Sequence, residues 1–213
     1  YNFTTIRSCN IVQADLGTDN SNAYGVYVFD KAKNNTALNN TIRTYGNIGY
    51  GIYLFSEVYN NSVYNNNITT SGLTNGYGVV LGTTSYSNSV YGNVITTSGS
   101  TGYGVYLTLT AYDNSIYRNV ITTSEANGYG IELFSDVYNN NIYENIITTS
   151  GNDAYGVILS TTAYNNNIYN NNITTKGNKL AFGPFGVFLT TSAYNNNIYN
   201  NNITTSGNYG YGV

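Results

Sequence analysis

Acidic side chains are the groups in this chain best suited to chemistry, because two carboxyl groups can act together as acid and base. Glu57 and Asp136 occupy the same position of a sequence repeat, but three repeats apart. If repeats are spaced like neighbouring β-strands, that separation is about 14 Å, too long for a paired-carboxylate glycosidase site. Glu132 is expected to point outward with no acidic neighbour in register. The acidic residues therefore predict no catalytic pair.

Few other residues could act together with these acidic side chains in catalysis or metal binding. The chain has no His and one Cys, which leaves no Ser-His or Cys-His pair, no ordinary zinc site and no internal disulfide. Cys9 is expected to be a small buried residue. Glu144 and Arg118 hold the same position on adjacent repeats and predict a surface ion pair of small energetic value. We therefore expect no catalytic residue, no metal site and no cofactor.

The elements that would position any functional residue come from an internal repeat. The phrase Tyr-Gly-Val or Tyr-Gly-Ile recurs along the whole chain, with Phe185 replacing Tyr once. The steps between its glycines are 26, 27, 26, 26, 26, 30 and 26 residues. A period this regular is typical of one structural unit stacked on copies of itself.

Each repeat contains three short apolar patches with period-two alternation, separated by turns rich in Asn and Gly. Three strands and three turns make a closed coil whose strands pair in parallel with those of the next coil. The rule for parallel crossovers favours a right-handed winding. The sequence therefore predicts an all-β, right-handed parallel β-helix of about eight coils, as a single domain over residues 1–213.

Stacking should place like residues above one another in interior columns. The first strand gives two columns, which contain Val79 with Val105 and Leu81 with Leu107. The second strand gives Val63, Val90, Ile116, Ile142, Ile168 and Ile198. The third strand is expected to give Ile68, Val94, Val120, Ile146, Ile173 and Ile203. A turn column of amides is expected at Asn67, Asn93, Asn119, Asn145, Asn172 and Asn202.

The run Asn165-Asn166-Asn167-Ile168-Tyr169-Asn170-Asn171-Asn172-Ile173 resembles the repeat of right-handed parallel β-helix proteins of the pectate-lyase-like and NosD-like kind, including archaeal and bacterial surface proteins. The resemblance covers nearly the whole chain and is specific for the fold. It implies lyases with clustered Asp, calcium and an Arg or Lys base, hydrolases with clustered Asp, adhesins or scaffolds. Arg118 as a lyase base has no accompanying acidic cluster for calcium.

Tyrosine is the most conspicuous residue of the surface. One set follows the buried position of the second strand, so its rings are expected to point outward along the rod. This set, which we call the outer Tyr column, consists of Tyr64, Tyr91, Tyr117, Tyr143, Tyr169 and Tyr199. Tyr packs well on strands without any further role, but a long exposed aromatic stripe is also typical of an interface for another rod or for sugar rings. We favour contact with protein, with surface glycans as the alternative.

The two chain ends read as continuations of each other. Val213 followed by Tyr1, Asn2 and Phe3 resembles the start of another coil, as does Tyr211 with its glycine. We therefore expect axial contacts through Tyr1, Phe3, Tyr211 and Val213 and head-to-tail stacking of copies into an open filament. The alternative is that the sequence is an excerpt of a longer repeat protein.

Composition constrains the partners. Charged residues make up 8% of the chain and the net charge is −3, so no nucleic-acid partner is expected, and no apolar run suits a membrane span. Acceptor sequences for glycosylation occur at Asn2, Asn34, Asn39, Asn60, Asn67, Asn172 and Asn202, by chance or by use. Few charges and many Tyr, Asn and Thr favour an extracellular or cell-surface location.

The sequence thus favours a non-catalytic structural protein of an extracellular assembly, such as a filament, sheath or surface layer. The alternative is a carbohydrate-binding or polysaccharide-cleaving β-helix protein.

Overall fold

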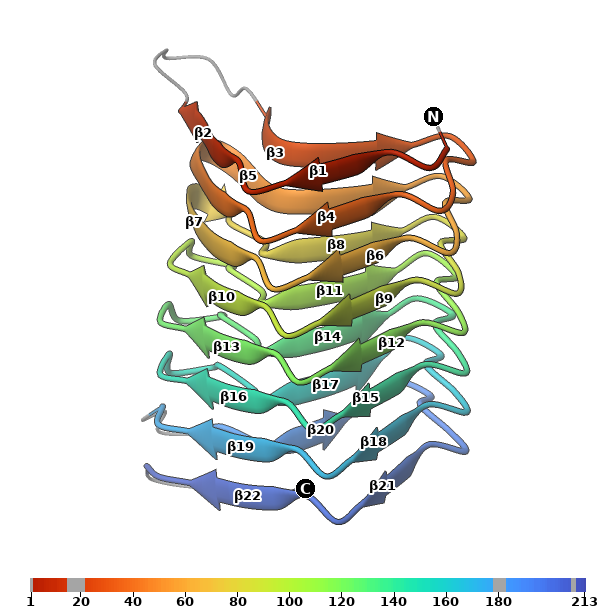
Figure 1. The fold of residues 1–213 in the computed structure, drawn as a ribbon. Helices are drawn as coiled ribbons and strands as arrows, with labels where there is room; N and C mark the ends of the chain where they lie inside the picture. The colour runs from red at the N-terminus through yellow and green to blue at the C-terminus, as the bar shows by residue number, and fades with distance from the viewer. Residues whose placement is uncertain (1, 15–21, 178–182, 208–209) are drawn as a thin grey trace.

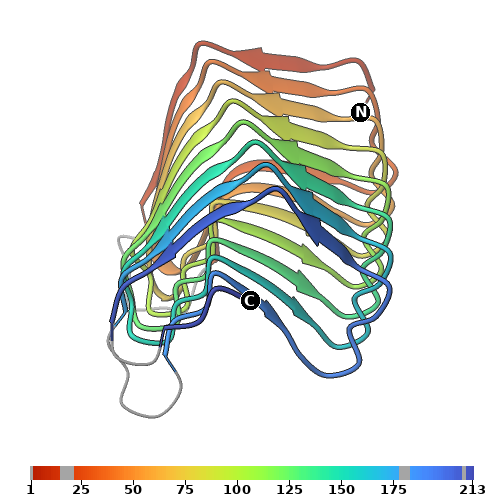
Figure 2. The same cartoon turned by 90° about the horizontal axis from the view of Figure 1, so that it is seen from below.

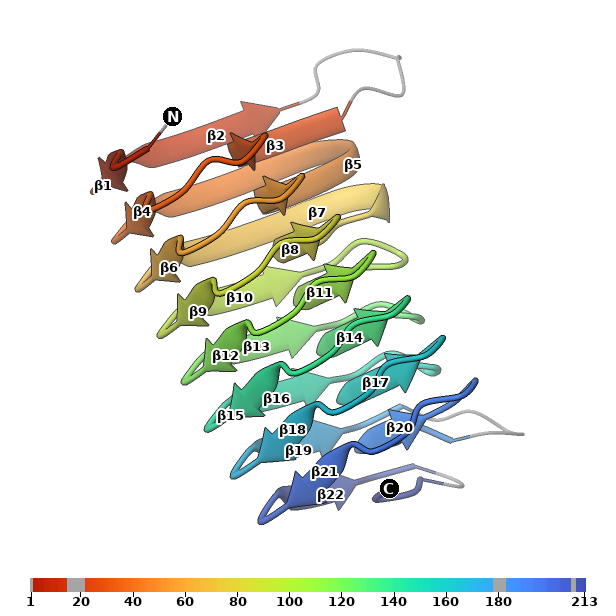
Figure 3. The same ribbon diagram turned by 90° about the vertical axis from the view of Figure 1, so that its right-hand side faces the viewer.

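The computed structural model describes residues 2–14, 22–177, 183–207 and 210–213 (Figure 1). This part of the chain contains 22 strands and no helix. The strands wind into a solenoid in which each coil lies directly on the one before it (Figures 1 and 3). The predicted all-β, right-handed parallel β-helix is confirmed.

Each coil presents three faces. The first face contains β3 (Asn22–Phe29), the second part of β5 (Thr41–Phe55), β8 (Val79–Gly82), β11 (Val105–Thr108), β14 (Ile131–Phe134), β17 (Val157–Ser160) and β20 (Val187–Leu189). The second face contains β1 (Thr5–Arg7), β4 (Thr36–Leu38), β6 (Ser62–Tyr64), β9 (Ser89–Tyr91), β12 (Ser115–Tyr117), β15 (Asn141–Tyr143), β18 (Asn167–Tyr169) and β21 (Asn197–Tyr199). The third face contains β2 (Asn10–Ala14), the first part of β5, β7 (Asn67–Asn75), β10 (Val94–Thr97), β13 (Val120–Thr123), β16 (Ile146–Thr149), β19 (Asn172–Thr175) and β22 (Asn202–Thr205).

Pairing between coils is parallel and in register, as the repeat predicts. Val79 lies opposite Val105, and Leu81 lies opposite Leu107. One difference from three separate strands per coil is β5, which runs without a break from the third face into the first face of the next coil. Through β5 these two faces join into a 14-stranded sheet, while the second face is a separate eight-stranded sheet.

The interior columns of the first and second strands are confirmed, but the predicted third-strand column was wrong by one residue in its middle coils. Val94 lies opposite Asn67, and Ile95 lies opposite Ile68. Val94 is 47% exposed, whereas Ile95 is fully buried. The interior column is therefore formed by Ile95, Ile121 and Ile147, whereas Val94, Val120 and Ile146 point outward. Because the strand has two adjacent apolar residues, either could be the inward one. The register with the next coil shows which of them is buried.

The same one-residue ambiguity affected the amide column. Asn67, Asn172 and Asn202 are outward and exposed. The inward column at this turn is Asn40, Asn66, Asn93, Asn119, Asn145, Asn171 and Asn201, and a second one runs through Asn35, Asn61, Asn88, Asn114, Asn140, Asn166 and Asn196. In each column the side-chain amide bonds both to the next amide and to backbone of the neighbouring coil. These bonds satisfy polar groups at turns that pack against the core.

Candidate functional site

The outer surface of the first face is dominated by aromatic rings. Its middle row lies two residues after each repeat glycine and is Tyr27, Tyr53, Val80, Tyr106, Glu132, Ile158 and Phe188. The row at the entrance to the strands is Tyr24, Tyr50, Tyr77, Tyr103, Tyr129, Tyr155, Phe185 and Tyr211. A third row includes Phe29, Phe55, Thr108, Phe134 and Ser160. We call these three rows together the aromatic face.

The repeat glycines create the shape of this face. A Cβ atom on Gly104 would lie 2.2 Å from Cγ2 of Ile121 and 2.6 Å from the carbonyl oxygen of Gly130. The same approach recurs from Gly25 to Gly186, so the backbone lies directly against the isoleucine column of the third face. Seen along the axis, each coil has an inward bend on one side (Figure 2). Only glycine fits at the close backbone approach, and the tyrosine before each glycine consequently lies beside it.

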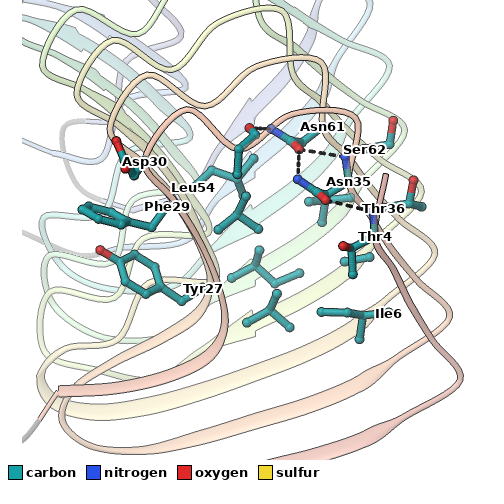
Figure 4. Close-up of a pocket in the computed structure, with 16 residues that line it drawn as sticks. Thr4, Ile6, Tyr27, Phe29, Asp30, Asn35, Thr36, Leu54, Asn61 and Ser62 are labelled. Carbon is teal, nitrogen blue, oxygen red and sulfur yellow. Dashed lines mark hydrogen bonds between the residues drawn. The ribbon is translucent and has the colours of Figure 1, made fainter. Parts of the chain in front are cut away.

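The rings of the aromatic face meet in several orientations. Along the entrance row they stack, as Tyr77 does on Tyr103 with centroids 4.7 Å apart and planes 10° apart. Between the rows they are tilted or edge-on, as for Tyr103 and Tyr106 at 5.4 Å and 66°. Tyr27 and Phe29 lie on the side of their strand opposite to the interior residue Leu54 (Figure 4). Rings of this face therefore meet edge to face as well as face to face.

Glu132 is the one carboxyl group in the middle row. It lies between Tyr106 and Ile158 in the register of β11, β14 and β17 and is only 7% exposed. Burial raises the pKa of Glu132 to about 7, and the neighbouring Tyr103 and Ser160 side chains offset only part of that rise. The predicted outward direction was right, but the residue is enclosed by its aromatic neighbours. A carboxyl group that titrates near neutral pH can donate or accept a proton.

The tyrosines around Glu132 keep their protons at neutral pH. Burial, followed by the charges of Glu132 and Tyr77, raises the pKa of Tyr103 well above its usual value. Burial, with smaller contributions from Tyr155, Glu132 and Asp153, raises the pKa of Tyr129 to about 12. These hydroxyl groups are therefore neutral hydrogen-bond donors beside the carboxyl group.

The other acidic residues singled out in the sequence lie elsewhere. Glu57 is exposed, with its Oε2 atom 4.0 Å from Nζ of Lys31, and Asp136 accepts a hydrogen bond from the Thr162 hydroxyl. The ion pair of Arg118 and Glu144 is confirmed, with Nε and Oε2 2.6 Å apart. Within the described ranges, no group of three or more His, Cys, Asp or Glu residues could hold a metal ion.

The outer Tyr column lies on the second face and differs from the aromatic face. Its six rings stack on one another with centroids 4.8 to 5.0 Å apart and planes within 6°. A second stacked column runs along the neighbouring turn and consists of Tyr59, Tyr86, Tyr112, Tyr138, Tyr164 and Tyr194. Each ring covers the faces of its neighbours, so these columns present mainly edges and hydroxyl groups. Contact with another protein through the outer Tyr column stays a prediction.

The residues expected at axial contacts are exposed where they are described. Phe3 is 78%, Tyr211 50% and Val213 66% exposed, and Tyr1 lies outside the described residues. Beside the first coil, a cavity of about 710 Å³ is lined by interior residues such as Ile6, Val26 and Leu54 (Figure 4). Asp30 is the one carboxyl group among the described residues that line this cavity, and most of the others belong to the core of the first coils. Head-to-tail stacking stays a prediction.

Several smaller expectations can be placed on the structure. Six of the glycosylation acceptors, at Asn2, Asn39, Asn60, Asn67, Asn172 and Asn202, are exposed, and Asn34 is half-buried. Cys9 is exposed, so the expectation that it is buried was wrong. Nowhere in the described part is there a helix long and apolar enough to cross a membrane.

Comparison with known proteins agrees with this architecture. The family model described as "right handed beta helix region" matches residues 1–173. The chain belongs to the right-handed β-helix family. The search of curated proteins finds no match. Among solved structures, a mutant of the periplasmic alginate epimerase AlgG is similar, with a TM-score of 0.50 and 15% identity. The likeness covers 93% of this chain and 50% of that one, so this β-helix spans about half the length of its structural neighbour.

The comparison also corrects the expectation that the protein is not an enzyme. A likeness at this identity shows the fold alone, but this solved structure, one of those that share the fold, is that of an alginate epimerase, an enzyme that acts on a polysaccharide. The absence of His and of an acidic cluster was therefore not sufficient reason to exclude catalysis. Sequence reasoning also missed the middle row of the aromatic face. The available signal was the residue two positions after each repeat glycine, which is aromatic in four coils.

Proposed function

We propose that the protein binds a polysaccharide along the aromatic face and that Glu132 acts there as an acid–base group. The observation that carries the proposal is a carboxyl group with a pKa of about 7, enclosed among tyrosines on the outer side of the first face. General acids and bases work best when their pKa lies near the working pH. Enclosure in an apolar site is how a carboxyl group reaches that range.

The surroundings of Glu132 suit an extended sugar chain. The entrance row of the aromatic face has a ring in every coil from Tyr24 to Tyr211, so aromatic side chains recur along the rod. Tilted rings provide apolar patches against which the C–H groups of a sugar can pack, and protonated tyrosine hydroxyls can bond to its hydroxyl groups. The β-helix family and the fold shared with an alginate epimerase support a carbohydrate function over a filament or sheath. A polysaccharide ligand also agrees with a location outside the cytoplasm, extracellular or periplasmic.

The test measures binding and turnover with the same protein samples. Neutral and acidic polysaccharides are cast into native gels, and retardation of the protein reports binding. Released reducing ends and changes in the NMR spectrum of the polymer report reaction. We expect Tyr106→Ala to weaken binding at least tenfold and Glu132→Gln to abolish turnover while binding persists. Tyr117→Ala, which removes a ring of the outer Tyr column, is the matched control. Equal loss of binding in Tyr117→Ala and Tyr106→Ala would contradict the assignment of the site.

A further inference from the structure

The aromatic face carries a distinctive charge pattern. Its outward side chains on β3, β8, β11, β14, β17 and β20 are Tyr, Phe, Val, Ile, Thr and Ser, together with the single carboxyl group of Glu132. Among the residues that the structure describes, no Lys or Arg occupies an outward position on these strands. The face therefore offers hydrogen bonds and apolar contact, but no positive charge.

The described basic residues lie outside the strands of the aromatic face. Arg7 lies on β1 of the second face, and Arg43 lies in the part of β5 that belongs to the third face. Arg118 follows β12 and pairs with Glu144, and Lys176 follows β19. Lys31 lies beside Glu57, and the Lys33 ammonium group lies 5.3 Å from the centre of the Tyr59 ring. Lys179 is outside the described residues.

An acidic polysaccharide would meet an unfavourable environment on this surface. Each uronate unit brings a carboxylate, which must leave water without a cationic partner and approach the carboxyl group of Glu132. A bound cation could bridge two carboxylates, but none of the described acidic residues is clustered for that purpose. Charge repulsion and desolvation thus both act against a uronate chain.

From this pattern we infer that the ligand of the aromatic face is an uncharged polysaccharide. Its sugar C–H faces pack on the tilted rings, and its hydroxyl groups bond to tyrosine hydroxyls and to Glu132. The inference rests on the function proposed above and goes beyond it by naming the substrate class. It also separates this chain from the structurally similar alginate epimerase.

The charge of Glu132 provides an internal check. Because Glu132 loses its proton as the pH rises through about 7, repulsion of an acidic chain should be stronger at pH 8 than at pH 6. A neutral chain lacks that repulsion. Glu132→Gln removes the charge at every pH, and Tyr27→Lys adds a cation at a position of the middle row that is 46% exposed. Both variants should improve binding of an acidic polysaccharide.

The experiment uses affinity electrophoresis and calorimetry of the whole chain with a β-glucan, a mannan and a galactan against alginate and polygalacturonate. We expect at least one neutral polymer to bind tenfold or more tightly than both acidic ones at pH 8. In Glu132→Gln and Tyr27→Lys, the ratio between the affinities for the neutral and the acidic polymers should be smaller. Tighter binding of an acidic polymer that is lost in Tyr106→Ala would overturn the inference and leave the proposed function standing. Absence of all binding, or binding unchanged in Tyr106→Ala, would overturn both.

Discussion

The aromatic face and the outer Tyr column are both rich in tyrosine, yet they offer different surfaces. In the outer Tyr column one ring lies on the next, with planes only 1° apart for Tyr169 and Tyr199, so ring faces are used inside the column. On the aromatic face, rings from two rows meet at angles such as 82° for Tyr50 and Tyr53. Where every coil has the same tyrosine, the rings stack face to face. Where the residue varies between coils, the rings meet at other angles and one position is a carboxyl group, Glu132.

Different interior columns support the two surfaces. Behind the aromatic face lies the column of repeat glycines, which brings the backbone against the isoleucines of the third face. Beside the outer Tyr column lie the two columns of buried asparagines. A change in one interior column should therefore disturb the surface next to it more than the other surface.

The largest effect is expected from Asn119→Ala, which breaks the asparagine column next to Tyr117. The Asn119 side chain accepts hydrogen bonds from the backbone and side-chain nitrogens of Asn93 and donates to Val90 O and Asn145 Oδ1. All of these groups are buried, so their loss should lower the free energy of unfolding by about 4 kcal/mol. Urea denaturation measures the change.

Asn141→Ala is the matched control for that experiment, because the Asn141 side chain points outward and accepts one hydrogen bond, from Asn167. It should cost less than about 1 kcal/mol. A similar loss of unfolding free energy in both variants would show that the buried asparagine column does not stabilise the fold more than an exposed asparagine does. Polysaccharide binding by the folded Asn119→Ala protein should stay close to that of the unmodified chain.

The next largest effect is expected from Gly130→Ala. The new Cβ atom would lie 2.3 Å from Cγ2 of Ile147 and 2.4 Å from the carbonyl oxygen of Gly156, and a backbone atom cannot easily move aside. Overpacking of this kind should cost about 3 kcal/mol. Because the close backbone approach beside Tyr129 is then lost, binding at the aromatic face should weaken as well, which Asn119→Ala should not cause.

Gly212→Ala serves as the control, since nothing lies within 4 Å of a Cβ atom at this position of the same repeat phrase. Thermal and urea unfolding should leave it within about 0.5 kcal/mol of the unmodified chain. If Gly130→Ala were equally harmless, close backbone approach would not be what shapes the aromatic face.

The fold could be predicted from the sequence because the repeat gives the length of each coil and the period-two alternation indicates where its strands lie. The prediction was wrong by one residue wherever two similar neighbours competed for the interior, as in Val94-Ile95 and Asn66-Asn67. Parity within one strand cannot decide such a case. The decision comes from register with the next coil, where Ile95 meets Ile68 and Asn93 bonds to Asn66.

The candidate site was less accessible to sequence reasoning. The period-two alternation correctly predicts that Glu132 points outward. An outward carboxyl group is usually solvated, however, and Glu132 has no second carboxyl group beside it that would indicate a catalytic pair. Its environment depends on rings from three coils, Tyr77, Tyr103 and Tyr129, and on the close backbone approach at the glycines. Those are properties of the stacked structure and not of any single repeat.

A third prediction concerns stability against pH. Glu132 has a pKa of about 7 in the folded chain and 4.5 as a free side chain, so between these values the folded state binds more protons than the unfolded state. The contribution of Glu132 is therefore fully present below pH 4.5 and is lost as the pH rises through 7, by about 3 kcal/mol. Glu132→Gln should abolish this slope and be the more stable protein at pH 8.

Urea denaturation from pH 5 to pH 8 measures that dependence. Glu144→Gln is the control, because Glu144 also lies near Tyr143 but is exposed and pairs with Arg118 on the second face. Its replacement should leave the slope from Glu132 in place. An equal pH dependence in Glu132→Gln and the unmodified chain would mean that the carboxyl group is solvated, and the two tyrosine-rich surfaces would then no longer differ in this respect.

The smallest effect is expected from Tyr117→Ala in the outer Tyr column. Tyr117 stacks between Tyr91 and Tyr143, with both centroids 4.8 Å away, and it is half-buried. Loss of these ring contacts should lower the free energy of unfolding by about 1 kcal/mol, and Tyr117→Phe, which keeps the ring, should cost almost nothing. Neither variant should change polysaccharide binding, since this column presents edges and lies on a different face from Glu132. If Tyr117→Ala impaired binding as much as Tyr106→Ala, orientation of the rings would not be what separates the two surfaces, and any exposed tyrosine row of this solenoid would serve a sugar chain equally well.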